Sequence, residues 1–81
     1  MSFEFAAKEK VVGLKQTRRA VAAGTAATVY LAKDADPKLT EPLYAMCRLA
    51  GVEALCEYTM AELGKCCGIA VGTAACAVLE K

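Results

Sequence analysis

Residues 13–20 read Gly-Leu-Lys-Gln-Thr-Arg-Arg-Ala and predict the first strand-turn-helix unit of the chain. They follow the apolar pair at 11–12 and precede Val-Ala-Ala-Gly, so we expect a short strand, a turn at Gly13 and then a helix. Helix starts carry partial positive charge and usually hold Asp or Glu. This start instead holds cations and an amide: Lys15, Gln16, Arg18 and Arg19. Folding does not require this cationic composition, so the composition indicates a binding function. The alternative is that these residues form an ordinary solvated helix face.

Helical and strand patterns alternate on both sides of this unit. Amphipathic spacing and cap residues predict helices over 3–9, 17–23, about 40–50 and 60–67. β-Branched, aromatic or uncharged runs predict strands over 10–12, 28–33, 52–57 and 73–79, the last of them central in a sheet. The alternation predicts a single domain, residues 1–81, with an α/β fold: a three-layer α/β/α sandwich around a mixed four-stranded sheet.

Individual residues set the expected helix ends. Left-handed glycines are expected to end three helices, at Gly24, Gly51 and Gly68. A loop is expected at Asp34, Asp36 and Pro37. The next helix is expected to begin near Thr40, with Pro42 in its first turn. Its expected buried face consists of Leu39, Leu43, Met46, Cys47 and Ala50. Thr59 and Glu62 have the spacing of a capping box before the helix at 60–67.

Composition and charge narrow the class of protein. The chain is 57% hydrophobic and 23% charged, so it has enough apolar surface to fold. Its net charge of +1 gives no global attraction to polyanions, but cations cluster around a single acid, Glu9, at Lys8, Lys10, Lys15, Arg18 and Arg19. The uncharged run 66–79 is too short for a bilayer crossing, which needs about 20 residues, so no membrane partner is expected.

The cysteines are expected to be core residues rather than ligands. The chain has five, Cys47, Cys56, Cys66, Cys67 and Cys76, and no histidine. Their spacing matches no common zinc motif, so neither a metal nor another cofactor is expected. The N-terminal segment carries acids where a secretory signal would carry cations, and a cytoplasmic location is expected.

The sequence contains few residue combinations that are typical of enzymes. No Ser-His-Asp or Cys-His combination and no glycine-rich phosphate loop is present, and Asp34 and Asp36 sit where aspartate is common in turns. The helix start at 13–20 is the stronger candidate, because lysine and arginine contact phosphate and glutamine can pair with a base edge. Tyr58 could stack on a flipped base, and a partly buried tyrosine is an equal alternative.

Three segments resemble the kink-turn-binding ribosomal protein superfamily and, within it, the small bacterial YbxF-like members. They are the Gly-x-Lys-Gln-Thr turn, the Ala-Lys-Asp-Ala-Asp-Pro loop and the Leu-Gly-Lys-x-Cys-Gly-Ile-x-Val-Gly segment. The resemblance covers residues 8–79 and implies an RNA-binding α/β/α domain. Relatives of this kind bind kink-turns, which are sharply bent internal loops built on sheared G·A pairs.

The resemblance also implies which residues meet RNA. In the first turn, Lys15 and Gln16 would read base edges, Arg19 would supply a basic group and Gly13 would allow close approach. Thr17 and Arg18 would lie beside the RNA backbone. Two further segments would line the site, at Lys33 and Asp34 and at Glu57, Tyr58 and Thr59. Archaeal and eukaryotic relatives carry Asn-Glu in place of residues 15–16, so the class of target is carried over rather than each atomic contact.

The expected function is therefore non-catalytic binding of kink-turn RNA, in ribosomal or other structured RNA. RNA is the expected partner, the ribosome is a candidate partner, and a monomer is expected. The alternative is a protein-interaction module of the translation machinery with weak RNA affinity.

Overall fold

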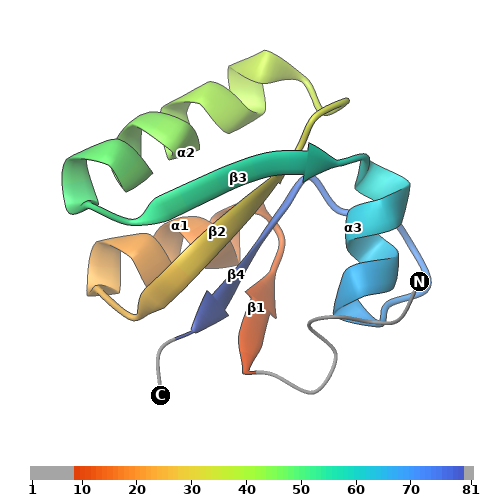
Figure 1. The fold of residues 1–81 in the computed structure, drawn as a ribbon, viewed down its shortest axis with the longest axis horizontal. Coiled ribbons are helices and arrows are strands. Elements are labelled where there is room, and N and C mark those ends of the chain that lie inside the picture. Colours follow the sequence, from red (N-terminus) through yellow and green to blue (C-terminus); the bar gives the residue numbers. More distant parts are fainter. Residues whose placement is uncertain (1–8, 80–81) are drawn as a thin grey trace.

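The computed structural model describes residues 9–79 and arranges them around one sheet (Figure 1). The elements are β1 (Lys10–Val12), α1 (Leu14–Ala23), β2 (Ala26–Ala32), α2 (Pro37–Ala50), β3 (Glu53–Tyr58), α3 (Met60–Cys67) and β4 (Ala75–Leu79). The sheet has four strands in the order β1-β4-β2-β3. β4 pairs antiparallel with both β1 and β2, whereas β2 and β3 are parallel. The expected mixed four-stranded sheet, with the last strand inside it, is confirmed.

Successive residues of each strand point to opposite faces of the sheet, so each face has its own core. On one face Val29 and Ala77 pack with α1 and α2, which supply Val21, Leu43 and Cys47. On the other face the cluster consists of Ala32, Ala35, Leu63, Cys66, Cys67 and Cys76, with α3 as its helix. Figure 1 shows α1 and α2 side by side and α3 apart from them. The α/β/α sandwich is therefore confirmed.

Helix α1 begins three residues before the expected position. The backbone N–H of Thr17 donates to the carbonyl of Gly13 at 2.9 Å, so the first helical bond already encloses residues 14–16. Gly13 precedes the helix with φ 103° and ψ 154°, a conformation that is almost confined to glycine. The sequence prediction missed this start because no capping side chain marks it. Lys15 and Gln16 consequently lie within the first helical turn.

Helix α2 also begins earlier than expected, at Pro37 rather than near Thr40. The Asp36 carboxylate accepts a bond from the backbone N–H of Lys38 at 3.0 Å, and proline suits the first helical position. Pro42 consequently lies inside the helix, where it is exposed, and not in the first turn. Two residues of its expected buried face are exposed instead, Leu39 at 52% and Ala50 at the end of the helix.

The other expected boundaries differ by little. Helix α3 and strand β1 span the expected residues, and helices α1, α2 and α3 end at Gly24, Gly51 and Gly68 in the left-handed conformation. Strand β2 begins two residues early, strand β3 is shifted by one residue, and strand β4 begins at Ala75 rather than 73. The helix expected over 3–9 lies outside the described residues except for Glu9, which precedes β1 without being helical. Between residues 9 and 79, none of the helices has the length and apolarity needed to cross a bilayer.

Four of the five cysteines are buried, as expected, and Cys56 is exposed. Cys56 lies on the edge strand β3, where the pairing with β2 is irregular. Tyr30 and Ala32 are two residues apart, yet they pair with Leu55 and Tyr58, so β3 carries an extra residue between them. This bulge accompanies the exposure of Cys56 and corrects the expectation that every cysteine is a core residue.

Candidate nucleic-acid interface

Three of the segments expected to meet RNA lie at one end of the sheet. Strands β1, β2 and β3 run in the same direction, so the residues that follow them emerge together. Backbone hydrogen bonds of 2.8 Å hold them there: Lys33 N–H donates to Tyr58 O, while Gly13 N–H and Ala32 N–H donate to Ala75 O and Ala74 O at the start of β4. The structure therefore brings residues 13–19, 33–34 and 57–59 to a shared end, which we call the loop end.

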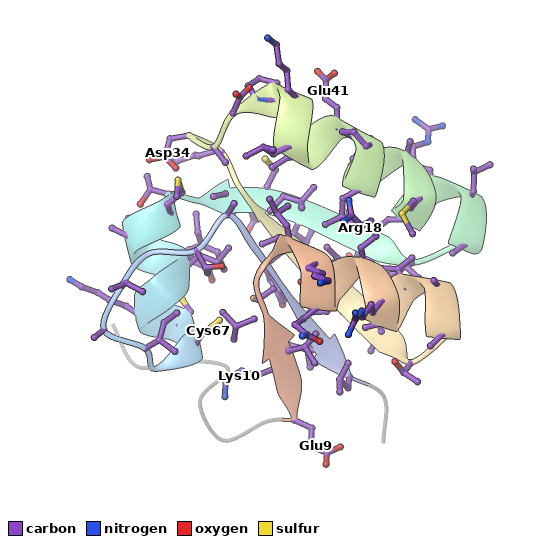
Figure 2. The ribbon with its side chains drawn as sticks, turned by 180° about the vertical axis from the view of Figure 1, so that it is seen from behind. Glu9, Lys10, Arg18, Asp34, Glu41 and Cys67 are labelled. Carbon is purple, nitrogen blue, oxygen red and sulfur yellow. The ribbon has the colours of Figure 1, made fainter. Side chains whose placement is uncertain are left out.

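The first turns of α1 present the cationic residues to solvent. Lys15, Gln16, Arg18 and Arg19 are all exposed. Helical spacing separates them, because Lys15 and Arg19 are one turn apart on the outer face while Gln16 and Arg18 flank it. In Figure 2, Arg18 extends from α1 toward α2. A large ligand could therefore contact this helix start both at its outer face and on the side toward α2.

The position of Thr17 differs from the expected one beside the RNA backbone. Its side chain is 0% exposed and faces the core together with Ala20 and Val21. Its Oγ1 atom is buried without a hydrogen-bond partner in the described part of the chain. The alternation of exposed and buried residues along one helix causes this difference, since a residue two positions after Lys15 falls on the inner face.

The N-terminus of α1 is open, whereas those of α2 and α3 are occupied by side chains. Helix α1 has no capping side chain and no acid in its first turn. Asp36 caps α2, and Thr59 and Glu62 form the expected capping box on α3, with bonds of 3.1 and 2.9 Å. Open first-turn N–H groups and the helix dipole favour a phosphate. Of the three described helices, α1 is therefore the one whose start can receive an anion.

The second segment, Lys33 and Asp34, forms hydrogen bonds mainly within the protein. Lys33 is exposed, and its backbone N–H donates to Tyr58. The Asp34 carboxylate accepts a hydrogen bond from the backbone N–H of Met60 at 2.7 Å, so it contacts the start of α3. Figure 2 shows Asp34 in the loop beside that helix. Asp34 thus belongs to the loop end, but one of its carboxylate oxygens is already bound to the protein.

The third segment consists of a strand end and a helix cap. Glu57 and Tyr58 are the last residues of β3, and Thr59 is the cap of α3. The ring of Tyr58 is half-buried and packs against Tyr30, with ring centroids 6.2 Å apart and tilted by 48°. The structure therefore favours the partly buried alternative for Tyr58, while Glu57 is exposed.

Charge divides the loop end into a cationic side and an acidic side. Lys15, Arg18 and Arg19 belong to α1, while Asp34, Glu57 and Glu62 surround the start of α3. The hydrogen bond from the Thr59 backbone N–H lowers the pKa of Glu62, and so that carboxylate stays ionised beside α3. Lys33 offsets part of this negative charge, since its positive charge also lowers the pKa of Glu62, so a polyanion meets attraction at α1 and a mixed field near α3.

Sequence reasoning missed one segment of the loop end, the connection between α3 and β4. Val71 lies there and is 70% exposed. The connection packs tightly on α3, because a Cβ at Gly64 would collide with the Val71 carbonyl oxygen and the N–H of Thr73 donates to Met60 O at 3.2 Å. The sequence signal that could have identified this connection is an apolar residue, Val71, between Gly68 and Gly72. It was not recognised because the whole run 66–79 is uncharged.

Comparison with known proteins agrees with this geometry. The family profile of the ribosomal protein L7Ae/L30e/S12e/Gadd45 family matches residues 5–81. The chain is 42% identical over 82 residues to the RNA-binding protein YbxF of Geobacillus stearothermophilus, covering 99% of this chain and 100% of that protein. It is 42% identical over 69 residues to the RNA-binding protein TTE2299 of Caldanaerobacter subterraneus subsp. tengcongensis, covering 85% and 84%.

Two solved structures share the fold. A Bacillus halodurans protein with unknown function superposes with a TM-score of 0.85 at 21% identity, covering 96% of this chain and 80% of that one. The Giardia lamblia 15.5kD RNA binding protein superposes with a TM-score of 0.83 at 26% identity, covering 89% of this chain and 61% of that one. The resemblance seen in the sequence is thereby confirmed: the chain belongs to the ribosomal protein L7Ae/L30e/S12e/Gadd45 family.

Proposed function

We propose that the chain is a non-catalytic RNA-binding protein that recognises kink-turn RNA through the loop end. The observation that carries the proposal is the open, cationic start of α1, whereas the starts of α2 and α3 are already capped by side chains. The chain also belongs to a family in which relatives similar to it are named RNA-binding proteins, and this supports the proposed RNA binding. The target is ribosomal or other structured RNA, bound by a monomer in the cytoplasm.

The arrangement favours a distorted groove over a regular duplex. The major groove of regular A-form RNA is deep and narrow, so side chains on a helix cannot reach its bases. Lys15 and Gln16 lie in the first turn of α1, where Gly13 leaves open space in front of the backbone. A groove widened by sheared G·A pairs could admit that turn, with base edges within reach of Gln16 and phosphates within reach of the α1 amides.

Binding to two matched RNAs tests the proposal. One is a duplex that contains a single kink-turn, and the other is the same duplex with its G·A pairs replaced by Watson-Crick pairs. Calorimetric titration at several salt concentrations should give tighter binding to the kink-turn at every concentration. Binding to the control should weaken steeply with salt, because nonspecific affinity comes from phosphate contacts. Equal affinity for both RNAs would contradict kink-turn recognition.

A protein-interaction role in the translation machinery is the second candidate. Exposed apolar side chains on α2 favour it, since Leu49 is 90% and Tyr44 is 44% exposed. Under this alternative, binding to both RNAs would be weak and Leu49→Ser would reduce co-sedimentation with ribosomes. Under the RNA-binding proposal, Leu49→Ser leaves the affinity for the kink-turn unchanged.

A further inference from the structure

Two aspartates in one short loop bind two different helices. The Asp36 carboxylate accepts from the N–H of Lys38, two residues later, and so caps its own helix α2. The Asp34 carboxylate accepts from the N–H of Met60, which is 26 residues away and begins α3. Both carboxylates are exposed. They therefore share a loop, a charge and a type of partner, but Asp34 alone of the two joins distant parts of the chain.

The Asp34 bond pairs an N–H group at the start of α3 that the capping box leaves open. Thr59 and Glu62 already satisfy each other's backbone N–H groups across the first turn. Met60 instead serves as a junction, because its N–H donates to Asp34 while its carbonyl accepts from the N–H of Thr73. The loop after β2 and the connection before β4 are thus both attached to one residue at the start of α3.

We propose that Asp34 is a positioning residue for RNA binding, which sets where the start of α3 lies relative to the open start of α1. The proposal rests on kink-turn recognition through the loop end. Asp34 holds the Tyr58–Thr59 segment in place through Met60, and a neighbouring bond from Lys33 N–H to Tyr58 O supports the same alignment. A preorganised surface loses less freedom on binding. Removing the bond between Asp34 and Met60 should therefore weaken binding of a bent RNA that must contact the starts of both α1 and α3.

Charge alone predicts the opposite effect, which makes the proposal testable. An aspartate near a polyanion repels it, so a variant that only loses the charge should bind RNA as well or better. Loss of positioning should instead weaken binding to the kink-turn. Asp36→Ala is the matched control, because it removes the same charge from the same loop and breaks a helix cap without touching α3.

The experiment measures binding of wild type, Asp34→Ala, Asp34→Asn and Asp36→Ala to the kink-turn duplex and its Watson-Crick control. Asp34→Ala should lose affinity for the kink-turn by about fivefold, the factor expected from one ordinary net hydrogen bond. Its affinity for the control should be unchanged or higher. Asp34→Asn keeps a side-chain oxygen that can accept from Met60 and should restore the preference. Asp36→Ala should keep the wild-type preference.

Hydrogen exchange of the Met60 amide provides a readout that needs no RNA. It should be faster in Asp34→Ala than in wild type and unchanged in Asp36→Ala. Equal RNA preference in Asp34→Ala and wild type would overturn the proposal while leaving kink-turn recognition intact. A wild-type chain without preference would overturn kink-turn recognition and the role of Asp34 with it. Unfolding of Asp34→Ala at the assay temperature would also overturn it, since Asp34 would then serve the fold.

Discussion

Lys15, Gln16 and Thr17 are consecutive residues with different positions in the molecule. The first two side chains are exposed, while the third is buried with its hydroxyl unpaired in the described structure. Gly13 makes this arrangement possible, because its φ of 103° lets β1 lead into α1 without an intervening loop. Exposed residues proposed to bind and a buried residue of the fold are therefore separated by single positions, and substitutions can address them one at a time.

At this scale, Gln16→Ala and Arg18→Ala should fail in different ways. If Gln16 reads a base edge as proposed, Gln16→Ala should cost about 1 to 3 kcal/mol on the kink-turn and narrow its preference over the Watson-Crick control. If Arg18 contacts a phosphate as proposed, Arg18→Ala should weaken binding to both RNAs alike and reduce the slope of log affinity against log salt by about one unit. Calorimetric titration on both RNAs measures each effect.

Thermal unfolding is the control for that pair. Both side chains are exposed, so neither change should alter the free energy of unfolding by more than about 0.5 kcal/mol. An equal loss of affinity for both RNAs in Gln16→Ala would show that Gln16 is not a base reader. Unfolding of Gln16→Ala would show instead that it is a structural residue.

At the scale of elements, the starts of the helices set the acidic pH dependence of stability. Glu62 accepts a bond from the Thr59 N–H in the folded state, which lowers its pKa. A lowered folded pKa means that Glu62 stabilises the fold at pH values above its unfolded pKa. This contribution is lost as the pH falls through the folded pKa. Wild type should therefore be more stable than Glu62→Gln at neutral pH.

The stability difference between these two chains should shrink as the solution becomes acidic and vanish once Glu62 is protonated in the folded state. Urea unfolding at a series of pH values measures it. Glu41→Gln on α2 is the control, since Glu41 is exposed and lies outside the first turn of its helix, and it should show a smaller dependence. A difference that stays constant with pH would contradict the capping role of the Glu62 carboxylate.

Helix α3 also requires a glycine where helices usually prefer alanine. Gly→Ala inside a helix ordinarily stabilises it by about 1 kcal/mol. At Gly64 the added Cβ would collide with the carbonyl oxygen of Val71, which belongs to the backbone and cannot simply rotate away. Gly64→Ala should therefore destabilise the fold, by about 1 to 3 kcal/mol. Chemical unfolding measures the sign, and a stabilised variant would show that the α3–β4 connection can move.

At the scale of the whole molecule, the thiols report on folding. Four cysteines are buried, and burial raises the pKa of both Cys47 and Cys76, which keeps these thiols protonated and unreactive. Cys56 is exposed, so a thiol reagent should modify one cysteine per native chain and all five after unfolding. Mass spectrometry after a short reaction gives the count, and Cys56→Ser should reduce the native count to zero.

A reductant or a chelator should leave the unfolding temperature of the protein nearly unchanged, because free core thiols need neither a bond nor a metal. A large loss of stability with chelator alone would indicate a metal site. Rapid modification of several thiols in the native chain would show that the α3 layer opens easily.

Local signals in the sequence were enough for much of this fold. The approximate bounds predicted for helix α3 agree with the structure, because its cap, its apolar spacing and its terminal glycine all lie within ten consecutive positions, 59–68. The alternation of elements predicted the layers, and the composition of residues 15–19 predicted a cationic helix start. Such features depend on contacts between near neighbours, which a single sequence displays directly.

Long-range packing settled what those signals left open. The burial of Thr17, the bulge that exposes Cys56 and the tie between Asp34 and Met60 all depend on how β2, β3 and the helices meet. These contacts join residues far apart in the chain. No local pattern records them, because their free energy arises only when the sheet has assembled.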